Sequence, residues 1–203
     1  MYIALYLIIL FAGTAMMVQQ GLWNNAITLV NVIISGLVAF AFYQPLTIRV
    51  DEMLDGEYTY LLDFVMIWAL FVITMVITRA ITGLASKTRM RFKHPVDPVG
   101  GPAVGLIAAW VLAGIALASL HTSPMPKQAF GGGLVYSAAD VDSKSGLLNP
   151  DLAWLRFVET MAKADALGHA GRSFSAKAFV QIYADHREKF EKANAPWIRV
   201  RRS

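Results

Sequence analysis

The sequence contains no cysteine, and this absence excludes disulfide bonds, thiolate metal sites and cysteine nucleophiles. It also has little charge, since Asp, Glu, Lys and Arg make up 16 % of its 203 residues, against about 25 % in average soluble domains. Apolar and aromatic residues make up 56 %. These proportions exclude an ordinary soluble enzyme, which needs more polar surface, and also a disordered or collagen-like chain.

Charge is also absent from long stretches of the chain. No charged residue precedes Arg49, and none lies between Val99 and Pro126. The basic excess, a formal charge of +4, gathers near residue 90 and at the C-terminal end. Basic residues beside apolar runs indicate membrane topology rather than nucleic-acid binding, so we expect the lipid bilayer and no nucleic acid as a partner.

Four apolar runs are candidates for crossing a bilayer, which takes about 20 residues of helix. They cover residues 2–18, 22–43, 61–84 and 99–120. Because backbone groups in lipid must be paired within their own segment, each run predicts a helix. The first run is the shortest; it is either a retained helix or a cleaved signal peptide, although it lacks basic residues at its start. We expect an all-α fold with a four-helix transmembrane bundle.

The loops between the runs predict the orientation. Acidic residues dominate the loop near residue 55. Basic residues dominate the loop near residue 90, and these topology-setting residues are Lys87, Arg89, Arg91 and Lys93. Since Lys and Arg mark the cytoplasmic side, the second loop is expected inside a cytoplasmic (inner) membrane, and the C-terminal tail is expected to be exported.

Asn24 and Asn31 are polar residues of the second run. They are seven residues apart and share one helix face. Amides in lipid form hydrogen bonds between helices, so they predict either helix packing or the polar lining of a solute path. No acid or base lies deep in any run, which argues against an energised transporter.

Small residues form a ridge on the fourth run at intervals of four: Gly101, Gly105, Ala109 and Ala113. Such a ridge lets two helix backbones approach closely, either within one chain or in an oligomer formed with a second copy or another membrane protein. Asp97 precedes the ridge and is expected near the positive end of the helix dipole. With His94 it offers too few ligands for a metal site, and we expect no metal or cofactor.

The tail divides into two parts after the membrane domain at 1–121. A Gly/Pro/Ser-rich linker is expected over 122–148, where an Asp-rich stretch resembles a calcium loop but has Lys144 at a ligand position. Two short amphipathic helices are expected over 149–203. Arg187 is placed on the polar face of the second. These helices pack on each other, on the bilayer, or on a protein or anionic-lipid partner.

No catalytic motif accompanies these segments. HExxH, GxSxG and a glycine-rich phosphate loop are all missing, and His121, His169 and His186 are far apart in the sequence. We therefore expect no enzymatic activity and name no catalytic residue.

Asp97, Gly101 and Gly105, with small residues continuing through Ala109, resemble the fourth-span signature of the colicin V production (CvpA) membrane proteins. Gly21 followed by Ala26-Ile27-Thr28-Leu29-Val30 resembles the short first turn and second span of that family. The resemblance covers about residues 1–120. It implies a four-span cytoplasmic-membrane protein linked to the production or export of a peptide toxin, without established catalysis.

The chain departs from the family pattern at three places. Ala4 and Leu5 stand where an Asp is common, Gln20 stands in place of an Arg, and Pro98 follows the Asp in place of an Arg. The main hypothesis is a non-enzymatic scaffold or accessory factor in toxin secretion or envelope processes. The alternative is a small passive channel or transporter subunit that oligomerises through the fourth run.

Overall fold

The computed structural model describes residues 1–203 except 19, 55–58, 87–95, 127, 164–173 and 193–203. The described residues are almost entirely helical. The helices are α1 (Tyr2–Met17), α2 (Gly21–Met53), α3 (Thr59–Ala85), α4 (Val96–Leu120), α5 (Ala138–Ser143), α6 (Pro150–Lys163) and α7 (Ala176–Lys192), with a short 3₁₀ helix η1 (Ala129–Gly132). This result confirms the all-α prediction.

Three helices, α2, α3 and α4, are long and apolar enough to cross a membrane. The fourth predicted span is not confirmed, because α1 has only 16 residues. At 1.5 Å per residue it is about 24 Å long, which is less than the ~30 Å hydrocarbon core. The cause is local: α1 ends at Met17, and Gly21 turns the chain with a φ of +67° that only glycine adopts readily.

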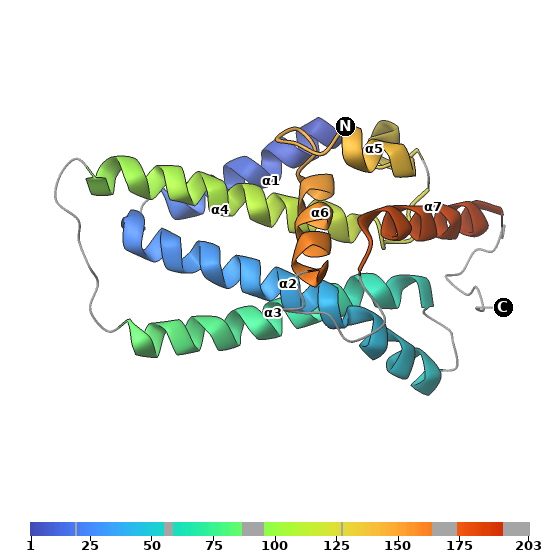
Figure 1. Cartoon of the computed structure of the whole chain (residues 1–203), viewed down its shortest axis with the longest axis horizontal. Helices are drawn as coiled ribbons and strands as arrows, with labels where there is room; N and C mark the ends of the chain where they lie inside the picture. Colours follow the sequence, from blue (N-terminus) through green and yellow to red (C-terminus); the bar gives the residue numbers. More distant parts are fainter. Residues whose placement is uncertain (19, 55–58, 87–95, 127, 164–173, 193–203) are drawn as a thin grey trace.

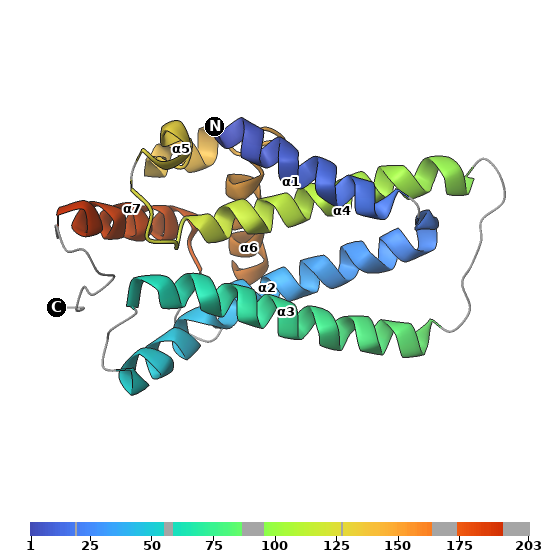
Figure 2. The ribbon, with the colours of Figure 1, turned by 180° about the vertical axis from the view of Figure 1, so that it is seen from behind.

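The long helices lie in a row, with α4 between α1 and α2, and with α3 on the far side of α2 (Figures 1 and 2). The Gly21 end of the row holds the starts of α2 and α4 and the end of α3. The opposite end, called the tail end below, holds the start of α1 and the helices that follow α4. Pro45 lies inside α2, and the last turns of that helix point away from the row (Figure 1).

Helix α6 lies across α4 and α2 in both views. Its Trp154 fills the space above Gly36 of α2, where an added Cβ would come within 2.5 Å of the indole ring. Gly114 of α4 likewise leaves room for the Pro150 carbonyl oxygen, because an added Cβ would lie 2.6 Å from that oxygen. Two glycines, one on each long helix, therefore let α6 pack directly on the bundle.

The main hydrophobic core joins the tail to the bundle. Buried residues of α6 and α7, among them Leu155 and Phe179, belong to one cluster with Phe40 of α2, Ile67 of α3 and Ile115 of α4. The ring centroids of Phe40 and Phe179 are 6.0 Å apart. The tail is thus built into the same core as the membrane helices, and this packing was not predicted from the sequence.

The range predicted as a linker, 122–148, contains η1 and α5. Helix α5 begins at a capping box in which the Ser137 side chain accepts from the Asp140 backbone and the Asp140 carboxylate accepts from the Ser137 N–H. Val141 of this helix is buried in the main core. The capping pair and this one apolar anchor explain why a stretch of linker composition forms a helix.

Candidate functional site

A buried polar junction fastens the tail to the bundle at the tail end. Asp151, in the first turn of α6, is fully buried. One carboxylate oxygen accepts a hydrogen bond of 2.7 Å from the Tyr2 hydroxyl, and the other lies 3.0 Å from His121 Nε2. Burial alone would raise the pKa of Asp151, but the hydrogen bonds from His121 and Tyr2 outweigh burial and hold that pKa below its usual range.

His121 directly follows α4, and its ring is 1 % exposed. Its Nδ1 lies 3.2 Å from Nη2 of Arg187. A guanidinium can only donate hydrogen bonds, so Nδ1 must accept, and the proton of the neutral ring must then sit on Nε2, facing Asp151. This tautomer links a buried carboxylate to a buried guanidinium through one neutral imidazole.

Arg187 comes from α7 and is 6 % exposed. Besides the imidazole, it donates to the backbone carbonyls of Leu134, at 3.1 Å, and His121, at 3.2 Å. Burial lowers the pKa of Arg187 from its ordinary value. The carbonyl of His121 lies at the C-terminal end of α4, where the helix dipole favours a cation.

The prediction for Arg187 was therefore wrong, since this side chain does not lie on the solvated face of its helix. Helical spacing alone placed it among the charged residues of α7. The structure instead directs it into the junction, where it donates to three acceptors, while its Nε has no hydrogen-bond partner among the described residues.

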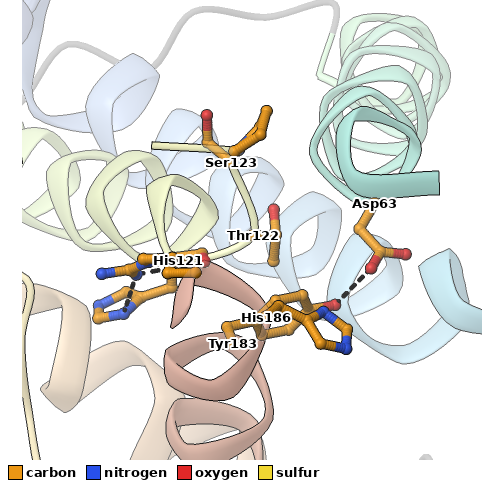
Figure 3. A pocket seen from close by; sticks show the side chains of 8 residues that line it. Asp63, His121, Thr122, Ser123, Tyr183 and His186 are labelled. Carbon is orange, nitrogen blue, oxygen red and sulfur yellow. Dashed lines mark hydrogen bonds between the residues drawn. The ribbon is translucent and has the colours of Figure 1, made fainter. Parts of the chain in front are cut away.

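A second buried contact lies beside the first. The Tyr183 hydroxyl of α7 donates to Asp63 Oδ2 of α3 at 2.8 Å and lies 3.3 Å from the Tyr43 hydroxyl of α2. Burial, followed by the neighbouring Tyr43 and Asp63, raises the pKa of Tyr183 well above its usual value. Figure 3 shows Tyr183 and Asp63 pointing toward each other across the junction.

The chemistry open to this junction is limited by its shape. A cavity lined by Asp63, His121, Tyr183 and Arg187 among others has a volume of about 10 Å³ (Figure 3), which is room for about one water. A histidine bonded to a carboxylate can serve as a general base, but the other ring nitrogen faces Arg187 here, and the cavity admits no substrate. The geometry therefore suits holding helices together.

The predicted small-residue ridge is covered within the chain. Gly101 meets the backbone of Gly21, and Gly105 meets Met17, with an added Cβ falling 3.2 and 3.1 Å from them. Ala109 packs against Gly13 of α1, and Ala113 belongs to a second buried cluster with Tyr2 and Tyr6. The sequence left open whether this face packs within one chain or in an oligomer. In the structure it packs within the chain.

Asp97 lies in the first turn of α4, but its carboxylate accepts from the backbone N–H of Leu22 at 2.8 Å. It therefore caps the start of α2 as well as facing the dipole of its own helix. Nearby, the Asn25 amide donates to the carbonyls of Met17, at 3.0 Å, and Gly101, at 2.7 Å. Asn25 was not among the predicted site residues, although a third amide on an apolar helix was the available signal.

Asn24 and Asn31 line a polar groove between α2 and α3, near the Gly21 end, with a volume of about 330 Å³. The remaining lining residues are Gln20, Ile27, Thr28, Arg79, Thr82, Gly83 and Ser86. Asn31 is 2 % exposed, and its amide nitrogen donates to the Thr82 hydroxyl at 3.1 Å. The groove thus brings the two predicted asparagines together with a cation and several hydroxyls.

Other predicted residues cannot be placed. Lys87, Arg89, Arg91, Lys93 and His94 lie outside the described residues. Within the described part of the chain, no group of three or more His, Asp or Glu residues could hold a metal ion. The sequence alone does not bring these groups together, because Asp151 is 30 positions from His121 and Asp63 is 120 positions from Tyr183.

Comparison with known proteins gives one match. The family model described as Colicin V production protein matches residues 2–138, which extends past α4 through η1 and includes His121. Neither the curated proteins nor the solved structures contain a significant match to the chain.

Proposed function

The chain belongs to the colicin V production protein family, and from this premise we propose that it is a non-enzymatic scaffold or accessory factor in peptide-toxin export or in related envelope processes. Three apolar helices fit a multi-pass membrane protein. The observation that carries the proposal is the Asp151–His121–Arg187 chain, which ties α6 and α7 to the membrane helices.

Such an attachment supports a scaffold because it fixes where the tail sits relative to the bilayer. Gly36 is 15 positions beyond Gly21, and Gly114 is 18 positions beyond Val96, so α6 crosses at about 22 to 27 Å from the Gly21 end. This height is close to the far boundary of a ~30 Å hydrocarbon core that begins at that end. An amphipathic helix at such a boundary can present its outer face to a partner.

The orientation predicted from the basic loop supports the same proposal. With the loop near residue 90 in the cytoplasm, the tail end faces outward from a cytoplasmic membrane, on the side where an exported product emerges. Ile182 on α7 is 45 % exposed there and offers an apolar surface to a partner.

Toxin export from host cells tests the proposal. Deletion of the gene should reduce extracellular toxin several-fold, and the full chain should restore it. Ile182→Glu should restore it poorly, although the protein accumulates and melts like wild type. The matched control is Gln181→Glu, on the adjacent exposed position. Unchanged toxin levels and envelope integrity after deletion would contradict the proposal.

A passive channel or transporter subunit is the second candidate, and the polar groove is the observation that favours it. The groove reaches Asn31, beyond which Val32 and Phe71 belong to the buried core. A continuous path would therefore require a second copy or an opening of α2 from α3. Solute flux into reconstituted vesicles that Asn31→Leu abolishes would support this candidate, and vesicles of wild-type protein without flux would contradict it.

A further inference from the structure

The groove between α2 and α3 has a composition that calls for a ligand from outside the chain. Among its described lining residues are the cation Arg79 and several amides and hydroxyls, but no carboxylate. Arg79 is exposed and has no carboxylate partner among the described residues. A guanidinium binds phosphate through two parallel N–H donors, and Arg79 is free to do so.

Asn31 supplies a second, independent observation. The Thr82 hydroxyl donates to the Thr78 carbonyl at 2.8 Å, so its oxygen must accept from Asn31, and the Asn31 nitrogen is the donor. This hydrogen bonding assigns the amide orientation. The carbonyl oxygen Oδ1 is then a buried acceptor without a partner in the described structure. It lacks a donor such as a ligand hydroxyl.

Arg79 and Asn31 lie at a similar depth in the groove. Trp23 donates to Ser86 at 2.8 Å and joins α2 to α3 near the Gly21 end. Asn31 is eight positions from Trp23 and Arg79 is seven from Ser86, so both lie about 10 to 12 Å from this contact along their helices. The guanidinium and the unpartnered amide oxygen therefore lie at a similar height along the groove.

The surroundings of the groove select an amphiphile. Val30 and Ile34 on α2 are apolar and 51 and 41 % exposed. A polar groove flanked by exposed aliphatic side chains matches a lipid whose head enters the groove while its acyl chains run along the helices. A second copy of the chain fits less well, because a two-fold contact would bring two Arg79 cations together without a groove carboxylate between them.

We propose that the groove binds the phosphate of an anionic, hydroxyl-bearing ligand, with Arg79 holding the phosphate and Asn31 Oδ1 accepting from the hydroxyl. The expected source is a membrane phospholipid with a glycerol head group, namely phosphatidylglycerol. A soluble phosphate ester such as glycerol 3-phosphate has the same chemistry and would come from the aqueous side. The site is separate from the buried junction and does not depend on the proposed scaffold role.

Native mass spectrometry of the full chain in detergent tests the site. Phosphatidylglycerol should bind at least about tenfold more tightly than phosphatidylcholine, and Arg79→Gln should remove about that factor, a size typical of one charge-assisted contact. The matched control is Arg49→Gln, which removes an exposed arginine of α2 outside the groove. Arg79 is exposed, so its variant should fold.

Two further ligands sharpen the result. Phosphatidic acid lacks the head-group hydroxyl, so wild type should prefer phosphatidylglycerol over it, and Asn31→Leu should lose that preference. If glycerol 3-phosphate binds as tightly as the lipid and its binding depends on Arg79, the groove is a phosphate site for a soluble ligand. Equal binding of all lipids, or equal binding by wild type and Arg79→Gln, would overturn the proposal.

Discussion

The two ends of the helix row are held together by different means. At the Gly21 end, helices meet through backbone, with Gly101 against Gly21 and Asp97 capping Leu22, while the groove beside them stays open. At the tail end, buried charged and aromatic side chains from distant parts of the sequence meet around Asp151 and Tyr183, and the cavity that Asp63, His121 and Tyr183 line is about 10 Å³. The tail end, where buried side chains meet, is suited to holding α6 and α7 on the bundle. The Gly21 end, with its groove, is suited to binding a ligand.

The largest expected effect comes from removing the carboxylate at the tail end. Asp151→Ala leaves the Tyr2 hydroxyl and His121 Nε2–H without their acceptor. Leaving two buried donors unsatisfied costs about 1–3 kcal/mol each, so the free energy of unfolding should fall by about 2–6 kcal/mol. Thermal unfolding in detergent, monitored by tryptophan fluorescence, measures this loss of stability.

The control for this variant is Asp142→Ala. Asp142 pairs with Lys177 at an exposed position on the tail, so its loss should barely move the melting temperature. Equal melting temperatures for the two variants would show that the junction contributes no more than a surface ion pair.

The next effect tests the seat of α6 on the bundle. Gly36→Ala puts a methyl group within 2.5 Å of Trp154 and 2.6 Å of Ile115, and overpacking of this kind costs about 1–3 kcal/mol. Gly83→Ala is the matched control, because nothing lies within 4 Å of the added atom. In a helix that exchange should be neutral or stabilising. A destabilised Gly83→Ala with an unaffected Gly36→Ala would reverse the comparison.

A smaller effect is expected from acid. The folded state lowers the pKa of Asp151, so the unfolded chain binds its proton first as the pH falls. The stabilisation is complete above the ordinary pKa of about 3.9 and is lost as the pH falls through that value toward the folded pKa. The free energy of unfolding, measured from pH 6 to pH 3, should fall in the wild type by an amount that is missing in Asp151→Asn. Identical pH profiles for the two proteins would contradict this prediction.

The smallest effect is expected at the Gly21 end. Asp97→Ala removes the acceptor of the Leu22 N–H, and loss of a helix cap costs about 1 kcal/mol. Asp97→Asn keeps an acceptor and should restore most of the stability. An Asp97→Ala variant as unstable as Asp151→Ala would mean that the two ends are equally important.

The membrane helices could be predicted because long apolar runs have few folded alternatives. The runs at 22–43, 61–84 and 99–120 each lie within or closely match α2, α3 and α4. The small-residue ridge on α4 was predicted as a contact face, since its members repeat every four residues. Its partner was left open, because a ridge does not indicate whether the facing helix belongs to the same chain.

The junction could not be predicted, because its members are far apart in the sequence. Tyr2 and Asp151 are 149 positions apart, and Tyr183 and Asp63 are 120 apart. Arg187 was assigned to a solvated face because periodicity reports only the surface expected of an isolated helix. The groove was half predicted: Asn24 and Asn31 were named on one face, but Arg79 and Thr82 joined them only through the pairing of α2 with α3.

By itself, the sequence determined an all-helical chain with long apolar helices, because apolar length and backbone hydrogen bonding in lipid permit little else. It predicted four spans, of which the structure has three helices long enough to cross a membrane. Only the tertiary structure decided that α1 covers the ridge, that α6 crosses the bundle, and that Asp151, His121 and Arg187 meet. Polar side chains such as these are buried only where they find hydrogen-bond partners. The order of residues along the chain does not show which buried groups will become those partners.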